Sequence, residues 1–206
     1  MSIHMKWTLD EFTKPAFAKL LKPFENSIDD VLSITRAFSM ATKAHRGQFK
    51  KGNIFEPYIN HPLRVALILT DEIHIYDLDL ICAALLHDIL EKDPLANDSL
   101  LGNRLRLQFG ERVYNIVHAL SKPKIKNDDK HRILGEYFHN IAKGSEDVRY
   151  IKLADRLDNV RTLKNAPQRN KILRYKEETQ KYVVPIAEKT DEKFVFKLSV
   201  ALYELK

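Results

Sequence analysis

The stretch DLICAALLHDILE, residues 79–91, is apolar at almost every position until it reaches three polar side chains near its end. Its apolar residues do not alternate strictly with polar ones, as they would in a half-buried strand. Pro94 follows shortly afterwards and favours a chain that leaves the helix there. The stretch therefore predicts a buried helix over these residues that ends in His87, Asp88 and Glu91.

Helical spacing recurs through the rest of the chain. The segment 27–45 begins with Ser27, a capping residue, carries two aspartates in its first turn and then places apolar residues along one face. The chain has only 6 glycines, and β-branched runs with a period of two are absent. The sequence predicts an all-α protein, a helical bundle, with further helices over 63–69, 100–109, 113–120, 148–163 and after Pro185.

Two segments interrupt the helical pattern. The sequence GQFKKGNIFEPYIN, residues 47–60, contains glycines, asparagines and a proline and is expected to form a basic loop. Pro62 suits the first position of the next helix, which places His61 at the start of that helix. A second basic segment, SKPKIKNDDKHR over residues 121–132, is expected to be a mobile or ligand-facing linker.

Length and composition indicate one ordinary globular domain. The chain has 206 residues, 44% of them hydrophobic and 30% charged, which is enough to build one core and solvate its surface. We expect a single domain over 1–206, with core motifs in 37–163 and C-terminal helices in 170–206 packed on it. Cys82 is the only cysteine, so no disulfide framework is expected.

The sequence also restricts location and partners. Its N-terminus lacks the pattern of a secretory signal, and no apolar run approaches the ~20 residues that span a bilayer, so we expect a cytoplasmic protein that binds no membrane. A net charge of +6 permits an anionic partner. The basic residues are scattered and accompany no helix-turn-helix, zinc-finger or aromatic-basic signature, so we expect no nucleic-acid partner.

Two histidines and two aspartates are the candidate metal ligands. His87 and Asp88 are adjacent and can reach one ion, and His61 and Asp155 supply a second imidazole and a second carboxylate. A mixed nitrogen and oxygen set suits manganese, iron or zinc better than calcium. A role without metal stays open on these residues alone, since a His-Asp pair is frequent by chance and Asp155 fits a solvated helix face equally well.

Spacing adds a candidate catalytic base. Glu91 follows His87 by four residues, which is one helical turn, and from there a carboxylate can deprotonate a water. Asp155 and Asn159 are separated by the same interval, and Thr162 continues their face. We expect the cleft to lie between these two helices.

Four motifs in this order resemble the HD hydrolase domain of the RelA/SpoT family. They are AHRGQ, PYINHP, AALLHDILE and IKLADRLDNVRTL, and the match covers residues 37–163. The compact length resembles the stand-alone small alarmone hydrolases, including the metazoan Mesh type. This resemblance implies a helical HD domain in which His61, His87, Asp88 and Asp155 bind manganese.

The resemblance also implies a substrate. It would be a guanosine tetra- or pentaphosphate alarmone, from which the enzyme removes the 3′-pyrophosphate to leave GDP or GTP. Lys50 and Lys51 match a basic pair that touches the nucleotide, while Asn159, Arg161 and Thr162 match residues that line its pocket. Solvated surface charge is the alternative interpretation of the lysines. His45 matches a family histidine too, but we place it outside the metal ligands.

One position departs from the family pattern. The family usually has H-D-x-x-E-D, whereas Lys92 stands here in place of the last aspartate, so a proton acceptor has become a cation. Lys92 either weakens water activation or grips a substrate phosphate. We expect that Lys92→Asp preserves or raises pyrophosphate release, measured with purified protein. A large loss of release in that variant would instead indicate that Lys92 holds the substrate.

Two further functions stay open from the sequence. The first keeps the HD chemistry but acts on another nucleotide, such as (p)ppApp or NADPH. The second is an alarmone-binding protein with weakened catalysis, which Lys92 motivates. An assay of phosphate and pyrophosphate release from a panel of nucleotides would identify another substrate. Tight alarmone binding without turnover would indicate a binding protein.

Overall fold

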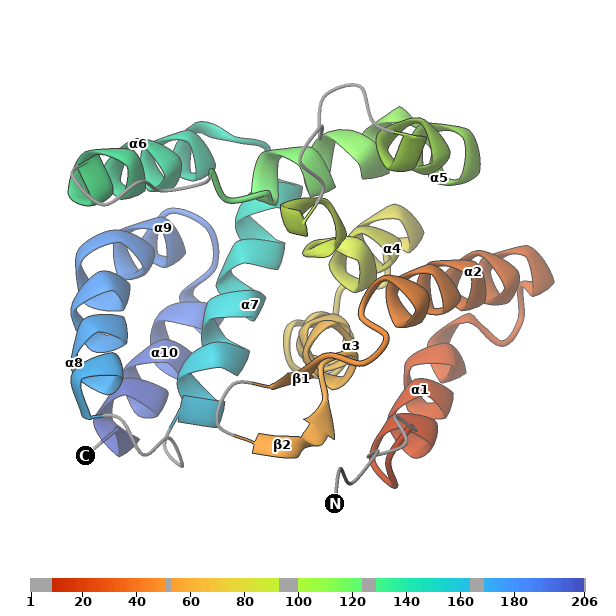
Figure 1. Cartoon of the computed structure of the whole chain (residues 1–206), viewed down its shortest axis with the longest axis horizontal. Helices are drawn as coiled ribbons and strands as arrows, with labels where there is room; N and C mark the ends of the chain where they lie inside the picture. The colour runs from red at the N-terminus through yellow and green to blue at the C-terminus, as the bar shows by residue number, and fades with distance from the viewer. Residues whose placement is uncertain (1–8, 51–52, 93–99, 124–128, 164–168, 206) are drawn as a thin grey trace, which may run out of the picture.

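Within its described residues the protein is a bundle of α-helices with one short β-hairpin (Figure 1). This computed structural model describes residues 9–50, 53–92, 100–123, 129–163 and 169–205, and only the backbone of residues 53–55, 92 and 130. The prediction of an all-α fold is confirmed. The α-helices of the described residues are α1 (Thr13–Leu21), α2 (Ile28–Ala44), α3 (Asn60–Leu67), α4 (Leu78–Leu86), α5 (Leu100–Leu120), α6 (Lys130–Lys143), α7 (Glu146–Leu163), α8 (Arg169–Glu178), α9 (Val184–Glu188) and α10 (Glu192–Glu204).

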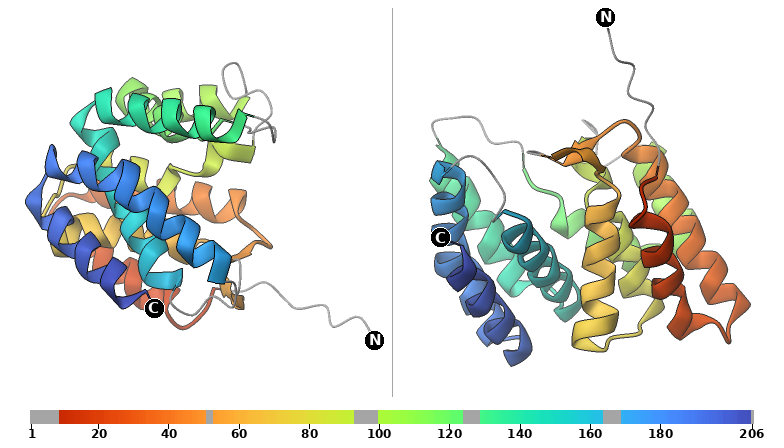
Figure 2. Two further views of the ribbon diagram at one scale, coloured as in Figure 1. Left: turned by 90° about the vertical axis from the view of Figure 1, so that its left-hand side faces the viewer. Right: turned by 90° about the horizontal axis from the view of Figure 1, so that it is seen from below.

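Helix α7 runs through the middle of the bundle (Figure 1). The C-terminal helices α8 to α10 pack on one side of it, and α3 and α4 pack on the other. The view from below shows α1 beside α3, on the far side from the C-terminal helices (Figure 2). Because α7 has neighbours all around, even its charged residues Lys152, Asp155, Arg156 and Asp158 are buried.

Helix α4 explains the apolar run of the sequence, because it packs against α2, α3, α5 and α7. Leu80 to Leu86 are all buried, and each large aliphatic side chain among them contributes ~1.5–3 kcal/mol of burial free energy. The prediction that this helix continues to Glu91 is wrong. It ends at Leu86, where His87 Nδ1 donates to the carbonyl of Ala84 at 2.8 Å. In a continuing helix that carbonyl would accept from Asp88.

The chain after α4 bends and then forms a short 3₁₀ helix, η3 (Ile89–Lys92). Two π-helical turns occur elsewhere, η2 (Ile68–Ile73) after α3 and η5 (Thr179–Val183) after α8, and η1 (Lys22–Phe24) follows α1. The two predicted helices flanking Gly110 form α5, which has a kink at that glycine, with φ 85° and ψ 171°. A positive φ is one that glycine adopts readily.

The predicted loop over 47–60 contains a small antiparallel sheet, so that prediction is wrong in part. Strand β1 (Phe49–Lys50) pairs with β2 (Asn53–Pro57), with Phe49 opposite Pro57 and an irregular register after it. Period-two alternation is not visible in such short strands, which is why the sequence does not reveal them. The hairpin places Lys50 beside α7.

The predicted linker over 121–132 is partly helical. Helix α6 begins at Lys130, inside the predicted linker, and residues 124–128 of that linker lie outside the described residues. Helix α1 has no counterpart among the helices that the sequence predicts. Across the described residues, no helix combines the length and the apolar character needed to cross a membrane.

Candidate metal and active site

His61 lies in the first turn of α3, where it faces α7 across the core. Its Nδ1 lies 2.7 Å from Asp158 Oδ2, and because a carboxylate only accepts, Nδ1 carries the proton. Its Nε2 lies 3.3 Å from Asp155 Oδ1 and 3.7 Å from Asp88 Oδ2. The hydrogen bond to Asp158 therefore turns the Nε2 atom of the ring toward two carboxylates.

His87 is oriented in the same way by the backbone. Its Nδ1 donates to the Ala84 carbonyl, so its Nε2 holds the lone pair. That Nε2 is buried and 3.3 Å from Asp88 Oδ2, yet it has no hydrogen bond of suitable geometry within the described part of the chain. A buried imidazole nitrogen with an unused lone pair, among carboxylates, is suited to binding a cation.

The ligand atoms of His61, His87 and Asp88 all lie within 4.8 Å of one another, and the two rings stand at 74° with centroids 5.2 Å apart. Asp155, the fourth predicted ligand, lies outside that group of three, and its Oδ1 is 3.3 Å from His61 Nε2. We call these four residues the metal cluster. Two imidazoles and the Asp88 carboxylate, with Asp155 beside them, form a candidate site for a divalent metal.

Electrostatics at the metal cluster favour a cation. Burial disfavours a charged His61, but the hydrogen bonds that its ring donates to Asp155 and Asp158 outweigh burial and raise the pKa of His61 to about 9. A bound cation would therefore take the place of the proton on Nε2. Burial likewise opposes a charged Asp155, yet Lys152 and His61 hold the pKa of Asp155 well below its usual value. The carboxylates stay ionised and create the negative potential that a divalent cation would neutralise.

Asp158 is a site residue that sequence reasoning missed. Besides orienting His61 it accepts from Arg64 Nε at 2.6 Å and lies 3.4 Å from Lys50 Nζ. It follows Asp155 by three residues and therefore shares its helix face, which was the available signal. Histidines that bind metals usually donate their second nitrogen to such a carboxylate.

We expect Asp158→Asn to weaken metal binding or turnover by ~10–100-fold. Both oxygens of Asp158 accept hydrogen bonds, so the NH2 group of an asparagine would have to face either His61 Nδ1 or Arg64 Nε. Titration calorimetry with Mn²⁺ and a turnover assay measure the two effects. Asp29→Asn is the matched control, since Asp29 is exposed at the start of α2. Equal metal affinity and turnover in Asp158→Asn and wild type would contradict this orienting role.

Tyr58 is the second residue that the sequence did not reveal. Its hydroxyl donates to Asp88 Oδ2 at 2.5 Å, and its ring packs on His45 with centroids 4.7 Å apart. Burial and the nearby Asp88 raise the pKa of Tyr58, so the phenol keeps its proton and acts as a donor. His45 is buried, and its Nδ1 lies 3.1 Å from Gln48 Oε1. It supports the tyrosine from outside the metal cluster.

Glu91 sits in η3, and the break after α4 replaces the helical turn assumed from the sequence. Its Oε1 is buried without a hydrogen bond among the described residues, and Lys122 Nζ lies 3.9 Å away. Burial and the Asp88 carboxylate raise the pKa of Glu91. A carboxylate with a raised pKa is better suited to exchange a proton near neutral pH than an ordinary glutamate.

The predicted substrate residues divide into two groups. Lys50 Nζ lies 2.6 Å from Thr162 Oγ1, beside Asp158, and Asn159 Nδ2 donates to Asp155 Oδ1. Lys50, Asn159 and Thr162 therefore lie next to Asp155 of the metal cluster or next to Asp158 beside it. Arg161 does not, because it forms a two-pronged ion pair with Glu72 of η2. Lys51 lies outside the described residues, and the side chain of Lys92 is not described either.

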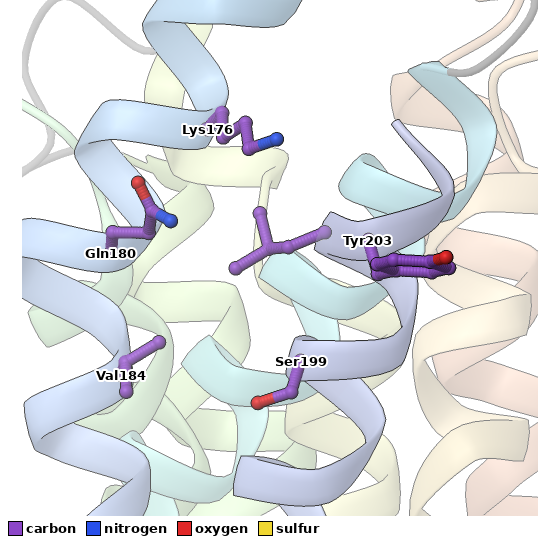
Figure 3. Close-up of a pocket in the computed structure, with 6 residues that line it drawn as sticks. Lys176, Gln180, Val184, Ser199 and Tyr203 are labelled. Atoms are coloured by element: carbon purple, nitrogen blue, oxygen red, sulfur yellow. The ribbon is translucent and has the colours of Figure 1, made fainter. Parts of the chain in front are cut away.

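Two surface pockets lie apart from the metal cluster. One, between α8, η5, α10 and the start of α9, is lined by Lys176, Gln180, Val184, Ser199, Leu202 and Tyr203 (Figure 3). The other, between α2 and α5, is lined in part by Arg36, Lys43 and Arg104. Neither of these two pockets is lined by a predicted site residue.

Comparison with known proteins identifies the family of the chain. Residues 37–191 match the HD domain family. The bifunctional (p)ppGpp synthase/hydrolase SpoT of Escherichia coli (strain K12) is 36% identical over 139 residues, which are 66% of this chain and 18% of SpoT. The chain thus spans less than a fifth of that relative's length.

Smaller proteins match over most of their length. The guanosine-3′,5′-bis(diphosphate) 3′-pyrophosphohydrolase MESH1 of Xenopus tropicalis is 35% identical over 136 residues, which are 66% of this chain and 72% of MESH1. A solved structure described as a metazoan ortholog of SpoT that hydrolyzes ppGpp has a TM-score of 0.72 at 28% identity, covering 84% of this chain and 97% of that one. The chain therefore belongs to the HD domain family, among the RelA/SpoT-type hydrolases that include the stand-alone Mesh type.

Proposed function

We propose that this protein hydrolyses the 3′-pyrophosphate of guanosine alarmones, converting ppGpp and pppGpp to GDP and GTP with release of pyrophosphate. The observation that carries the proposal is the orientation of two buried imidazoles. His61 and His87 use Nδ1 for fixed hydrogen bonds, and the Nε2 atoms of both rings lie within 3.7 Å of Asp88 Oδ2. The relatives of the chain, SpoT and MESH1, are named for synthesis or hydrolysis of the same nucleotides.

We further propose manganese as the metal, held by His61, His87, Asp88 and Asp155. When bound, a divalent ion there supplies a Lewis acid that polarises a phosphoryl oxygen and acidifies a water. The chain supplies the proton acceptor, and Glu91 is the proposed base because its buried carboxylate oxygen is free of hydrogen bonds among the described residues. Lys122, beside Glu91, would offset the negative charge of the departing pyrophosphate.

The nucleotide is proposed to lie along the hairpin side of the metal cluster. Lys50 is partly buried, with 16% of its side chain exposed, and is held by Thr162 and Asp158. A lysine fixed in this way contributes a positive charge without losing much side-chain freedom on binding. Lys51, Asn159 and Thr162 remain proposed nucleotide contacts, whereas the ion pair with Glu72 makes Arg161 the weakest member of that set.

The test is to incubate purified protein with Mn²⁺ and each of ppGpp, pppGpp, ppApp and NADPH, and to resolve the products by anion exchange. We expect GDP or GTP and one pyrophosphate per guanosine alarmone. Faster release of phosphate from NADPH, or faster cleavage of ppApp, would replace the proposed substrate while keeping the HD chemistry. Tight alarmone binding without products would support a weakened alarmone-binding protein instead.

A cytoplasmic location is part of the proposal, because phosphorylated nucleotides are made inside cells. The proposed partner is a small-molecule nucleotide, and nucleic acids and membranes are not proposed as partners. Immunofluorescence or fractionation of the expressed protein tests the location. Recovery of the protein with a membrane fraction after a salt wash would contradict it.

A further inference from the structure

Lys152 of α7 is a buried lysine, with 2% of its surface exposed. Its Nζ lies 5.2 Å and 5.8 Å from the ring centroids of Tyr137 and Phe138 on α6, and it donates to Asp155 Oδ2 at 2.8 Å. Removing an ammonium from water is costly, and a buried ion pair is on balance a weak source of stability. The energetic cost of burying Lys152 therefore suggests a role other than stabilising the fold.

The partner of Lys152 is also a member of the metal cluster. The two oxygens of Asp155 have different surroundings, since Oδ2 accepts from Lys152, while Oδ1 accepts from Asn159 and faces His61 Nε2 at 3.3 Å. A carboxylate can bind a cation through one oxygen or through both. With Oδ2 engaged by the ammonium, only Oδ1 is presented to the metal cluster.

We propose, resting on the function proposed above, that Lys152 is a positioning residue that restricts Asp155 to a single metal-binding oxygen and so keeps one coordination position free for water or substrate. Catalytic metal sites need such an open position, whereas structural sites fill every position with protein ligands. Lys152 is too deeply buried to meet the nucleotide itself, so it acts through Asp155.

This role has an electrostatic signature that separates it from simple support of the site. A positive charge next to a metal ligand repels the metal, so removing the charge should not weaken metal binding. A residue that merely held the site together would do the opposite, and its removal would lower metal affinity. The sign of the change in affinity therefore distinguishes the two roles.

The experiment compares Mn²⁺-loaded wild type with Lys152→Met, Lys152→Leu and Lys152→Arg. Calorimetry gives the Mn²⁺ dissociation constant, water-proton relaxation counts the waters on the bound ion, and ppGpp turnover gives kcat. We expect the Met and Leu variants to bind Mn²⁺ as tightly as wild type or more tightly, to carry one water fewer, and to lose about tenfold or more in kcat. Arginine, which keeps the charge and the donor, should restore the water count.

The measurements without substrate make the outcome independent of the proposed function. If wild type failed to cleave ppGpp, the function would be lost, but the affinity and water count would still test Lys152. A folded Met or Leu variant with an unchanged water count would overturn the inference. So would an Mn²⁺ dissociation constant measurably above that of wild type, since that result identifies structural support. Far-UV circular dichroism verifies folding, and Lys143→Met on the exposed end of α6 is the matched control.

Discussion

Replacing His87 with alanine is expected to remove both metal binding and alarmone hydrolysis. The change deletes the Nε2 lone pair that faces Asp88 and leaves the carboxylates of the metal cluster without one of their two imidazole partners. A metal that polarises a phosphoryl oxygen is worth several kcal/mol of transition-state stabilisation, so kcat should fall by about 10³-fold or more. Calorimetry with Mn²⁺ and product analysis with ppGpp measure the two losses.

The same substitution at a histidine outside the site is the control. His139 is exposed on α6, and His139→Ala should retain wild-type metal affinity and turnover. His87→Ala also removes the bond to the Ala84 carbonyl at the end of α4, so its folding must be verified by circular dichroism. A folded His87→Ala protein with undiminished turnover would refute the metal-dependent mechanism.

Local signals in the sequence predicted helices where the determinants lie within a few residues. Ser27 accepts from the Asp30 N–H at 3.3 Å and begins α2, as its type and position indicated. The end of α4 could not be predicted in this way. There, the His87 side chain donates a hydrogen bond to the backbone carbonyl of Ala84. Whether this bond forms depends on the fold around His87 rather than on helix propensity. The short hairpin after α2 was not predicted for a related reason, since strands of two and five residues that carry a proline and an asparagine show no clear alternation.

The site shows the same division between local and tertiary information. His61 and Asp155 are distant in sequence, and packing of α3 on α7 brings them together. Residue types and the resemblance of four motifs predicted both residues as ligands. The side chains that orient them could be identified only in the folded structure. Lys152 and Asp158 look like ordinary charges of a solvated helix face, and only the burial of α7 on all sides gives them roles. Arg161 lies on the same helix but reaches Glu72 instead.

The second large effect is expected for Glu91→Gln, which should lower kcat by about 10²–10⁴-fold while Mn²⁺ affinity stays close to that of wild type. Glutamine keeps the size and the hydrogen-bonding oxygen of Glu91 but cannot accept a proton from water. The substitution would also remove the ion pair between Lys122 Nζ and Glu91 Oε1, which are 3.9 Å apart. This loss should not affect the metal cluster. Steady-state kinetics with ppGpp and calorimetry with Mn²⁺ test both halves of this expectation.

Metal affinity and turnover respond differently to the loss of a ligand and to the loss of a base. Both losses abolish turnover, but only the loss of a ligand releases the metal. Glu177→Gln, an exposed position on α8, should change neither quantity. Full turnover in Glu91→Gln would assign proton transfer to another group. The double variant Glu91→Gln with Lys92→Asp would then be the next protein to assay, because the family pattern has an aspartate at the position of Lys92.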